Sequence, residues 1–238
     1  MPEAMFNYVI PSNAVPHTSW YELSAYLGDR FDPRLASGLD DKVMAEFCRY
    51  PDAATFYRES EIYCYHSIGY FLEGVKRPYY AQLFSATANL KSVSLLDYGC
   101  GAGDDGLLFL QAGYTVTFAD LPGKTLEFCR WRVDRRLALA RVLKIGQAEI
   151  PPHDIVWCMD VLEHLPPDRQ AELLTIMASL GSSVIVNLVN DPEADGTLHY
   201  PVDVEALTAF ASSRWPCSFQ DYYVGRVRLL SYHREIDA

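Results

Sequence analysis

Hydrophobic residues near the middle of the chain form two short runs, each associated with an acidic residue. The first run covers residues 93–98 and contains Asp97, and the second covers residues 115–119 and is followed by Asp120. A glycine-rich stretch follows the first run, and a helical pattern comes after it. Apolar runs of this length are typical of parallel strands that are buried on both faces. The pattern therefore predicts a strand, a tight turn, a helix and a second strand in this region.

Hydrophobic periodicity predicts further strands and helices along the rest of the chain. Strands are expected at residues 141–145, 155–159 and 183–189, and a terminal hairpin at residues 219–224 and 226–232. Helices are expected at residues 106–112, 123–139, 168–180 and 204–212. This alternation predicts an α/β fold: a Rossmann-like, mostly parallel sheet of seven strands with helices on both faces.

The first ninety residues show helical patterns instead. Helices are expected at residues 20–27 and 40–50, one or two aromatic-rich helices over 53–80 with a break at Pro78, and a further helix over 81–91. We interpret residues 1–90 as a helical cap and residues 91–238 as the ligand-binding core. A cap of this kind would shield a reaction from water and determine substrate specificity.

Two ligand-binding patterns overlap in the glycine-rich stretch. Gly101, Gly103 and Gly106 satisfy G-x-G-x-x-G, the pattern of dinucleotide sites, which is a weak signal on its own. Asp97 and Gly99, with Gly101 and Gly103, also give the pattern D-x-G-x-G-x-G. The glycines themselves therefore fit two different nucleoside ligands.

Acidic residues near the glycines favour one of these ligands. Asp104 and Asp105 stand at the start of the following helix, where they would repel a pyrophosphate that the helix N-terminus alone would attract. Asp120 is placed to accept hydrogen bonds from a ribose. A ligand with a ribose and a positive amino-acid end, but no phosphate, fits this charge pattern better. S-adenosylmethionine is such a ligand.

Two stretches resemble a known enzyme superfamily. Residues 95–103, Leu-Leu-Asp-Tyr-Gly-Cys-Gly-Ala-Gly, resemble motif I of class I S-adenosylmethionine-dependent methyltransferases. Residues 154–165, Asp-Ile-Val-Trp-Cys-Met-Asp-Val-Leu-Glu-His-Leu, are similar to the fourth-strand motif of the branch related to ubiquinone-biosynthesis methyltransferases. With Asp120, the resemblance covers about the C-terminal 60% of the chain. It implies a seven-stranded sheet whose last strand is antiparallel, and S-adenosylmethionine as the cofactor.

The resemblance also implies the cofactor contacts. The first strand end and the glycine turn would hold the methionyl end, and Asp120 the ribose hydroxyls. Gln147 stands where the family commonly has Asp, but its side-chain carbonyl can still accept a hydrogen bond from the adenine amine. Asp97 could instead cap the start of the helix, Asp160 and Glu163 could be surface carboxylates, and Met159 could belong to the core. The expected cofactor-binding residues are Asp97, Gly99, Cys100, Gly101, Gly103, Asp120, Leu121, Gln147, Ala148, Met159 and Asp160.

Three histidines and one tyrosine are candidates for the chemistry. His164 follows the predicted fourth strand, and His199 lies in the loop after the fifth, at the edge where such sheets bind ligands. Tyr63, His66 and Tyr70 would share one stripe of a helix, where they could line a pocket for a planar or cationic substrate. A hydroxyl acceptor would need one histidine as a base, whereas a neutral amine would not. Each of these residues could equally be structural.

Composition narrows the function classes. The net charge of −11 at pH 7 disfavours a nucleic-acid substrate, because binding to phosphates relies on Lys and Arg. Six cysteines show no C-x-x-C pair, so we expect reduced thiols and no metal. The sequence shows no signal segment and no apolar run of membrane-spanning length, which predicts a cytoplasmic protein with no membrane partner. The oligomeric state stays open, and a homodimer is one option.

The sequence therefore predicts a methyltransferase that transfers a methyl group from S-adenosylmethionine to nitrogen or oxygen of a small molecule. The acceptor would be a natural product or an amino-acid-like metabolite. One alternative is an NAD(P)-dependent oxidoreductase that uses the G-x-G-x-x-G pattern. Another is a cofactor-binding subunit without catalytic activity.

Overall fold

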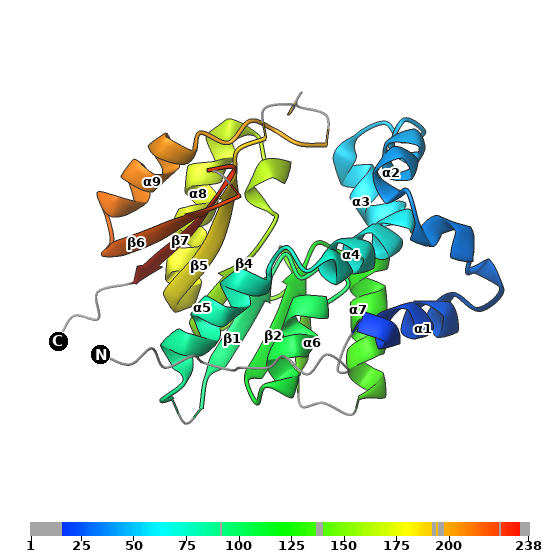
Figure 1. Cartoon of the computed structure of the whole chain (residues 1–238), viewed down its shortest axis with the longest axis horizontal. Helices are drawn as coiled ribbons and strands as arrows, with labels where there is room; N and C mark the ends of the chain where they lie inside the picture. Colours follow the sequence, from blue (N-terminus) through cyan, green and yellow to red (C-terminus); the bar gives the residue numbers. More distant parts are fainter. Residues whose placement is uncertain are drawn as a thin grey trace.

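A seven-stranded sheet forms the centre of the computed structural model, which describes residues 16–90, 92–136, 140–191, 194, 198–223 and 225–233 (Figure 1). The order across the sheet is β3-β2-β1-β4-β5-β7-β6, so the seven strands expected from the sequence are confirmed. Residues 137–139 of an expected helix, and residue 224 of an expected strand, lie outside the described residues. The strands are β1 (Ser94–Tyr98), β2 (Thr115–Asp120), β3 (Arg141–Lys144), β4 (His153–Cys158), β5 (Gly181–Val189), β6 (Cys217–Tyr222) and β7 (Val227–His233).

The direction of strand pairing changes towards one side of the sheet. β1 to β5 are joined by parallel pairings, whereas β7 pairs antiparallel with both β5 and β6. The expectation of a mostly parallel sheet thus holds for the first five strands, and the last two form the predicted hairpin. The chain leaves β1 towards one edge and continues from β4 towards the other. Open α/β sheets bind ligands at the carboxyl ends of the strands beside such a point.

Helices cover both faces of the sheet, because successive side chains of a strand point to opposite sides. Leu95 of β1 shares a hydrophobic cluster with residues of α6 and α7. Its neighbour Leu96 belongs to a second cluster with residues of α8 and α9. These helices are α6 (Asp104–Gln111), α7 (Lys124–Arg135), α8 (Pro167–Leu180) and α9 (Val204–Ser212).

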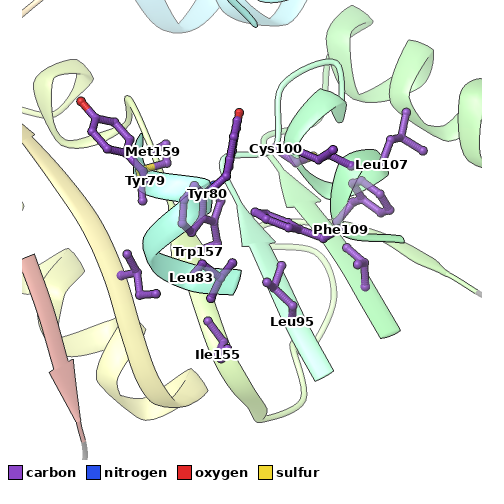
Figure 2. Close-up of a cluster of buried hydrophobic side chains, with 14 of the residues drawn as sticks. Tyr79, Tyr80, Leu83, Leu95, Cys100, Leu107, Phe109, Ile155, Trp157 and Met159 are labelled. Carbon is purple, nitrogen blue, oxygen red and sulfur yellow. The ribbon is translucent and has the colours of Figure 1, made fainter. Parts of the chain in front are cut away.

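Helix α5 (Arg77–Thr87) belongs to the packing of the sheet, although it lies within the first ninety residues. Figure 2 shows its buried face against β1 and β4, where the Tyr80 ring stacks on Trp157 with centroids 5.6 Å apart. Pro78 falls in the first turn of α5, where its missing N–H leaves no hydrogen bond unmade. The expected break is present, at residues 74–76 just before Pro78, but the helix expected over residues 81–91 begins earlier, at Arg77, and ends at Thr87.

In the described part of the chain, four α-helices precede α5 and form a group next to α7 (Figure 1). Local capping fixes their ends: the Asp52 carboxylate accepts the Thr55 N–H at 2.7 Å, and Gly74 follows α4 in the left-handed conformation. α4 contacts the glycine turn, where the Ala102 N–H donates to Ser67 Oγ at 3.3 Å. That this region acts as a cap stays a prediction. The helices are α1 (Pro16–Leu27), α2 (Leu39–Phe47), α3 (Ala53–Glu59) and α4 (Ile62–Glu73).

A buried arginine joins α1 to the glycine turn. Arg132 of α7 forms ion pairs with Glu22 at 2.9 Å and Asp104 at 2.8 Å. Its guanidinium also donates to the Ala102 carbonyl at 2.7 Å and to Ser19 Oγ at 2.8 Å, and Ser19 donates onward to Asp104. A buried charge is tolerated only when it is paired and hydrogen-bonded. The first helix is thus held to the sheet by an ion cluster in addition to its apolar contacts.

Replacing this arginine is expected to destabilise the whole protein. Arg132→Met should lower the free energy of unfolding by about 3–5 kcal/mol, because it leaves the Asp104 carboxylate buried without its cation. Urea denaturation followed by circular dichroism measures the change. Arg135→Met, at an exposed position of the same helix, should cost less than about 1 kcal/mol. Equal losses in the two variants would contradict the role assigned to the cluster.

Candidate functional site

The turn after β1 is built from glycines in the left-handed backbone region. φ is 73° at Gly99, 53° at Gly101 and 82° at Gly103, values that other residues rarely adopt. A Cβ on Gly99 would lie 2.3 Å from a methyl carbon of Val161, and one on Gly103 would lie 2.6 Å from the Cys129 sulfur. The predicted motif is therefore required by the local backbone and by its close packing.

Asp97 of β1 supports the start of α6. Its buried carboxylate accepts the Gly106 N–H at 2.9 Å. A Cβ on Gly106 would lie 2.7 Å from the same oxygen and 2.2 Å from the Phe118 ring, so the helix can approach the strands only with glycine there. Burial, together with the charge of Asp105, raises the pKa of Asp97 well above its ordinary value. The structural interpretation of Asp97 is thus confirmed, and its contact with a cofactor stays a prediction.

Asp120 joins the end of β2 to the same turn. One carboxylate oxygen accepts the Gly101 N–H and the other accepts the Leu121 N–H, both at 2.6 Å. Burial raises the pKa of Asp120 to about 6. Each carboxylate oxygen can accept a second hydrogen bond, so the side chain keeps capacity for two ribose hydroxyls. Leu121 is 53% exposed beside it, which leaves an apolar surface on which a ring can pack.

Asp104 and Asp105 are not free negative charges. Asp104 belongs to the ion cluster described above, and Asp105 accepts hydrogen bonds from Lys76 Nζ at 2.9 Å and from the Tyr80 hydroxyl at 2.7 Å. The Trp157 indole N–H is a third donor to Asp105, at 2.9 Å. The expectation that these acids would repel a pyrophosphate is therefore wrong, because internal partners already compensate them.

Asp160, directly after β4, is held in an unusual conformation by a residue that the sequence analysis missed. Its φ is 58°, which is uncommon for a residue with a side chain. Asn187 of β5 accepts the Asp160 N–H and donates back to its carboxylate, both at 2.7 Å. Asn187 is buried and interrupts the apolar run of residues 184–189 in this strand. A polar residue within an apolar run is the sequence signal that could have identified Asn187 as part of the site.

Glu163 is a buried carboxyl group at the same edge of the sheet. Its side-chain Oε2 has no hydrogen-bond partner among the described residues. Burial, with the nearby charge of Asp160, raises the pKa of Glu163 to about 8, so the group is mostly protonated at neutral pH. The alternative interpretation as a surface carboxylate is wrong for this residue.

His164 lies beside Glu163 and is held as a neutral ring. Its Nδ1 is 3.0 Å from the Leu198 carbonyl oxygen and 2.9 Å from the Tyr57 hydroxyl. Since a carbonyl only accepts, we assign the proton to Nδ1 and the lone pair to Nε2. Burial lowers the pKa of His164 to about 4. The ring of His199 lies with its centroid 4.9 Å away, and its Nδ1 is 3.3 Å from Asp191.

The predicted aromatic stripe is present on α4. The Tyr63 and His66 rings stack with centroids 5.5 Å apart, and His66 and Tyr70 follow at 6.5 Å. Tyr57 of α3 extends the series, with its ring edge-on to Tyr63 at 4.8 Å. Burial raises the pKa of the Tyr63 hydroxyl, and the acids at the strand ends raise it further. The His66 ring is 3.3 Å from Asp40, so it is tied to α2.

The remaining expected contacts differ in exposure. Gln147 and Ala148 lie exposed in the turn after β3, where their N–H groups donate to the Lys144 carbonyl at 3.1 and 3.2 Å. This turn follows the strand next to β2, on the side of the sheet where Asp120 lies. The side chains of Met159 and Cys100 are buried in the core cluster. These two residues could therefore contact a cofactor only through their backbone atoms.

Among the described residues, no three His, Cys, Asp or Glu side chains are grouped so that they could hold a metal ion. Within the same residues, no helix combines the length and the apolar character needed to cross a membrane.

Known proteins share part of this sequence. Residues 95–181 match a family model described as a methyltransferase domain. The ubiquinone biosynthesis O-methyltransferase of Bordetella avium (strain 197N) is 32% identical over 110 residues, which is 43% of this chain and 45% of that protein. The magnesium-protoporphyrin O-methyltransferase of Synechocystis sp. is 23% identical over 160 residues, 63% of this chain and 69% of that protein. The chain thus spans about half the length of the ubiquinone relative.

Solved structures share the fold. The magnesium protoporphyrin IX methyltransferase from Synechocystis PCC 6803, with bound S-adenosylhomocysteine, has a TM-score of 0.58 at 18% identity, over 80% of this chain and 94% of that one. The N-methyltransferase NodS from Bradyrhizobium japonicum WM9 has a TM-score of 0.53 at 15% identity, over 67% of this chain and 87% of that one. Fold and strand-end site define a Rossmann-like, nucleoside-binding α/β protein. Residues 95–181 therefore carry a methyltransferase domain, and the chain is similar in sequence and fold to class I S-adenosylmethionine-dependent methyltransferases.

The residues at the strand ends fit S-adenosylmethionine as a cofactor. Gly99, Gly101 and Gly103 leave the turn after β1 without side chains at three positions, so its backbone can approach a ligand closely. Asp120 keeps acceptor capacity for a ribose. Asp160 Oδ2 is buried and receives no hydrogen bond from the part of the chain that the structure describes, which suits an ammonium group. S-adenosylmethionine offers both a ribose and an ammonium.

The buried acid at this edge predicts a measurable pH effect. The folded pKa of Glu163 lies above its ordinary value of 4.5, so the folded state binds the extra proton and loses stability as pH rises from about 4.5 to about 8. Glu163→Gln removes this loss. The variant should gain stability over the native protein as pH rises, by about a few kcal/mol at pH 9.

Thermal and urea unfolding between pH 5 and pH 9 measures the difference. Glu172→Gln, an exposed position on α8, serves as the control and should follow the native protein at every pH. A constant offset between Glu163→Gln and the native protein across this range would contradict the elevated pKa of Glu163.

Proposed function

We propose that this protein transfers a methyl group from S-adenosylmethionine to an oxygen or nitrogen atom of a small molecule. The observation that carries the proposal is the convergence of Asp97, Asp120 and Asp160 at the carboxyl ends of three adjacent strands, around a turn of left-handed glycines. The match of residues 95–181 to a methyltransferase domain and the cofactor products bound to the structures that share the fold support it.

Oxygen is the favoured acceptor atom. The sequence relatives from Bordetella and Synechocystis are both named as O-methyltransferases. Nitrogen is the second option, because the structures that share the fold include an N-methyltransferase. The acceptor itself we place among small metabolites, of natural-product or amino-acid-like character, because the net charge of −11 opposes a nucleic acid.

The cofactor supplies an electrophilic methyl group on a sulfonium. The chain's own residues bind and orient it: Asp120 would accept from the ribose, Asp160 from the ammonium, and Leu121 would pack on the adenine. The rings of α3 and α4 would line the acceptor side and exclude water. Much of the acceleration in such a displacement can come from alignment in a closed site.

A hydroxyl acceptor must also lose a proton. His164 is neutral and offers Nε2, because Nδ1 is engaged by the Leu198 carbonyl. His199 lies next to it and is half exposed, so it can pass a proton to solvent. We assign the proton transfer to these two histidines, with Tyr63 and His66 on the acceptor side.

Two alternatives and two further expectations accompany the proposal. Asp104 and Asp105 are paired inside the protein, so their charge does not argue against binding of a dinucleotide. An NAD(P)-dependent oxidoreductase therefore has to be tested directly. A non-catalytic subunit would bind the cofactor without turnover. A cytoplasmic location and a homodimer stay predictions.

Cofactor identity is tested by calorimetry with S-adenosylhomocysteine and with NAD. We expect binding of the first and none of the second. Asp120→Ala should weaken S-adenosylhomocysteine binding by about 10-fold or more, because a charged acceptor of hydrogen bonds is lost. Asp134→Ala, exposed on α7, is the control and should bind like the native protein. Binding of NAD alone would end the methyltransferase proposal.

Turnover is tested with cofactor labelled in the methyl group and incubated with a metabolite extract. Labelled product identifies the acceptor atom and separates an enzyme from a binding subunit. Once an acceptor is known, its hydroxyl group decides whether a base is needed. If the acceptor oxygen carries a proton in the free substrate, His199→Ala should lower kcat by about 10²-fold or more. His233→Ala, exposed on β7, is the control. An unchanged pH–rate profile in His199→Ala would remove His199 from the proton path.

A further inference from the structure

Lys76 is a lysine buried at the strand ends, in the link between α4 and α5. Its side chain is 12% exposed, and Nζ lies 2.9 Å from Asp105 and 3.5 Å from Asp160. The ammonium also faces the Tyr70 ring, 5.6 Å from the centroid. Burial alone would lower the pKa of Lys76, but the two carboxylates outweigh it and raise the pKa. The lysine is therefore a permanent positive charge inside the candidate site.

The two acids beside Lys76 are satisfied to different degrees. Asp105 has a hydrogen bond from Lys76 and further ones from Tyr80 and Trp157. Asp160 receives two on Oδ1, from the Asn187 amide at 2.7 Å and from the Tyr70 hydroxyl at 3.5 Å, while its Oδ2, which faces Lys76, has none among the described residues. A lysine carries three N–H donors. Asp105 thus anchors the lysine, and the contact with Asp160 is a loose ion pair with unused capacity on the acid.

A loose ion pair of this kind is complementary to a zwitterion. The amino-acid end of S-adenosylmethionine carries an ammonium and a carboxylate on the same carbon, and Lys76 and Asp160 present the opposite charges side by side. Insertion of the zwitterion would replace one ion pair by two without adding net charge to a buried site. Such charge-assisted hydrogen bonds are the stronger ones in proteins.

We propose that Lys76 binds the carboxylate of the cofactor's methionyl end while Asp160 binds its ammonium. The inference rests on the proposed function, which supplies the cofactor, and deepens it. It makes a residue from the first ninety positions part of the cofactor site. The sequence analysis placed no cofactor contact in that region.

The test compares two ligands on two proteins by calorimetry. S-adenosylhomocysteine carries the whole zwitterion, and decarboxylated S-adenosylhomocysteine keeps the ammonium and lacks only the carboxylate. Lys76→Met should lower the affinity for S-adenosylhomocysteine by about 10- to 100-fold, which is the loss expected for a hydrogen bond to a charged group. The decarboxylated ligand should bind the variant as tightly as the native protein or more tightly, since a positive charge near its ammonium is removed.

Controls separate carboxylate recognition from structural damage. Arg77→Met, exposed at the next position, should bind both ligands normally. Lys76→Arg keeps a positive charge and should therefore restore part of the preference for S-adenosylhomocysteine over the decarboxylated ligand. Because Lys76→Met leaves two buried acids without their cation, the double variant with Asp105→Asn is made as well. It removes one charge of each sign and should show the same ligand dependence.

The outcomes are distinct. An equal loss of both ligands in Lys76→Met and in the double variant would overturn the inference, because a merely structural lysine does not sense the carboxylate. Unchanged binding of S-adenosylhomocysteine would overturn it too. Failure of the native protein to bind either ligand would refute the proposed function itself, and the inference with it.

Discussion

Burial of carboxyl groups at one edge of the sheet is the constraint on which the rest of this structure depends. Asp104 and Asp105 begin α6, and Asp160 follows β4, so negative charge accumulates where solvent is largely excluded. Two buried cations compensate it, Arg132 against Asp104 and Lys76 against Asp105 and Asp160. Arg132 also pairs with Glu22 of α1, and Lys76 lies in the link that follows α4. Charge compensation at the site thus attaches the N-terminal helices to the sheet.

The acids without a cation are stabilised in other ways. Asp120 accepts two backbone N–H groups, and Asp97 accepts one from the start of α6. Glu163 Oε2 has no hydrogen-bond partner within the described ranges, and burial raises the pKa of Glu163 to about 8, so at neutral pH it is mostly an uncharged acid. His164 is likewise held neutral by burial. The edge therefore combines fixed charges with groups that can exchange protons, an arrangement that suits both a zwitterionic ligand and a proton transfer.

Local patterns predicted the parts of this site that the backbone determines. The strands, the glycine turn and the acids at the ends of β1 and β2 could be read from the sequence, because each depends on a few consecutive residues. The partners of those acids could not. The Tyr57–His164 contact joins residues 107 positions apart, and Arg132 reaches Ser19 across 113 positions. Asp104 and Asp105 were read as free charges because nothing near them in the sequence indicates Arg132 or Lys76.

The same long-range contacts change how the first ninety residues should be understood. A cap that merely covers a site would contribute apolar surface and little else. Here Ser67 accepts the Ala102 N–H in the glycine turn, Tyr57 shares the His164 ring nitrogen, and α5 packs in the core of the sheet. A buried hydrogen bond or ion pair is costly to leave half made. The helices and the strand ends therefore stabilise one another's geometry, and specificity for the acceptor can arise from the same residues that hold the site together.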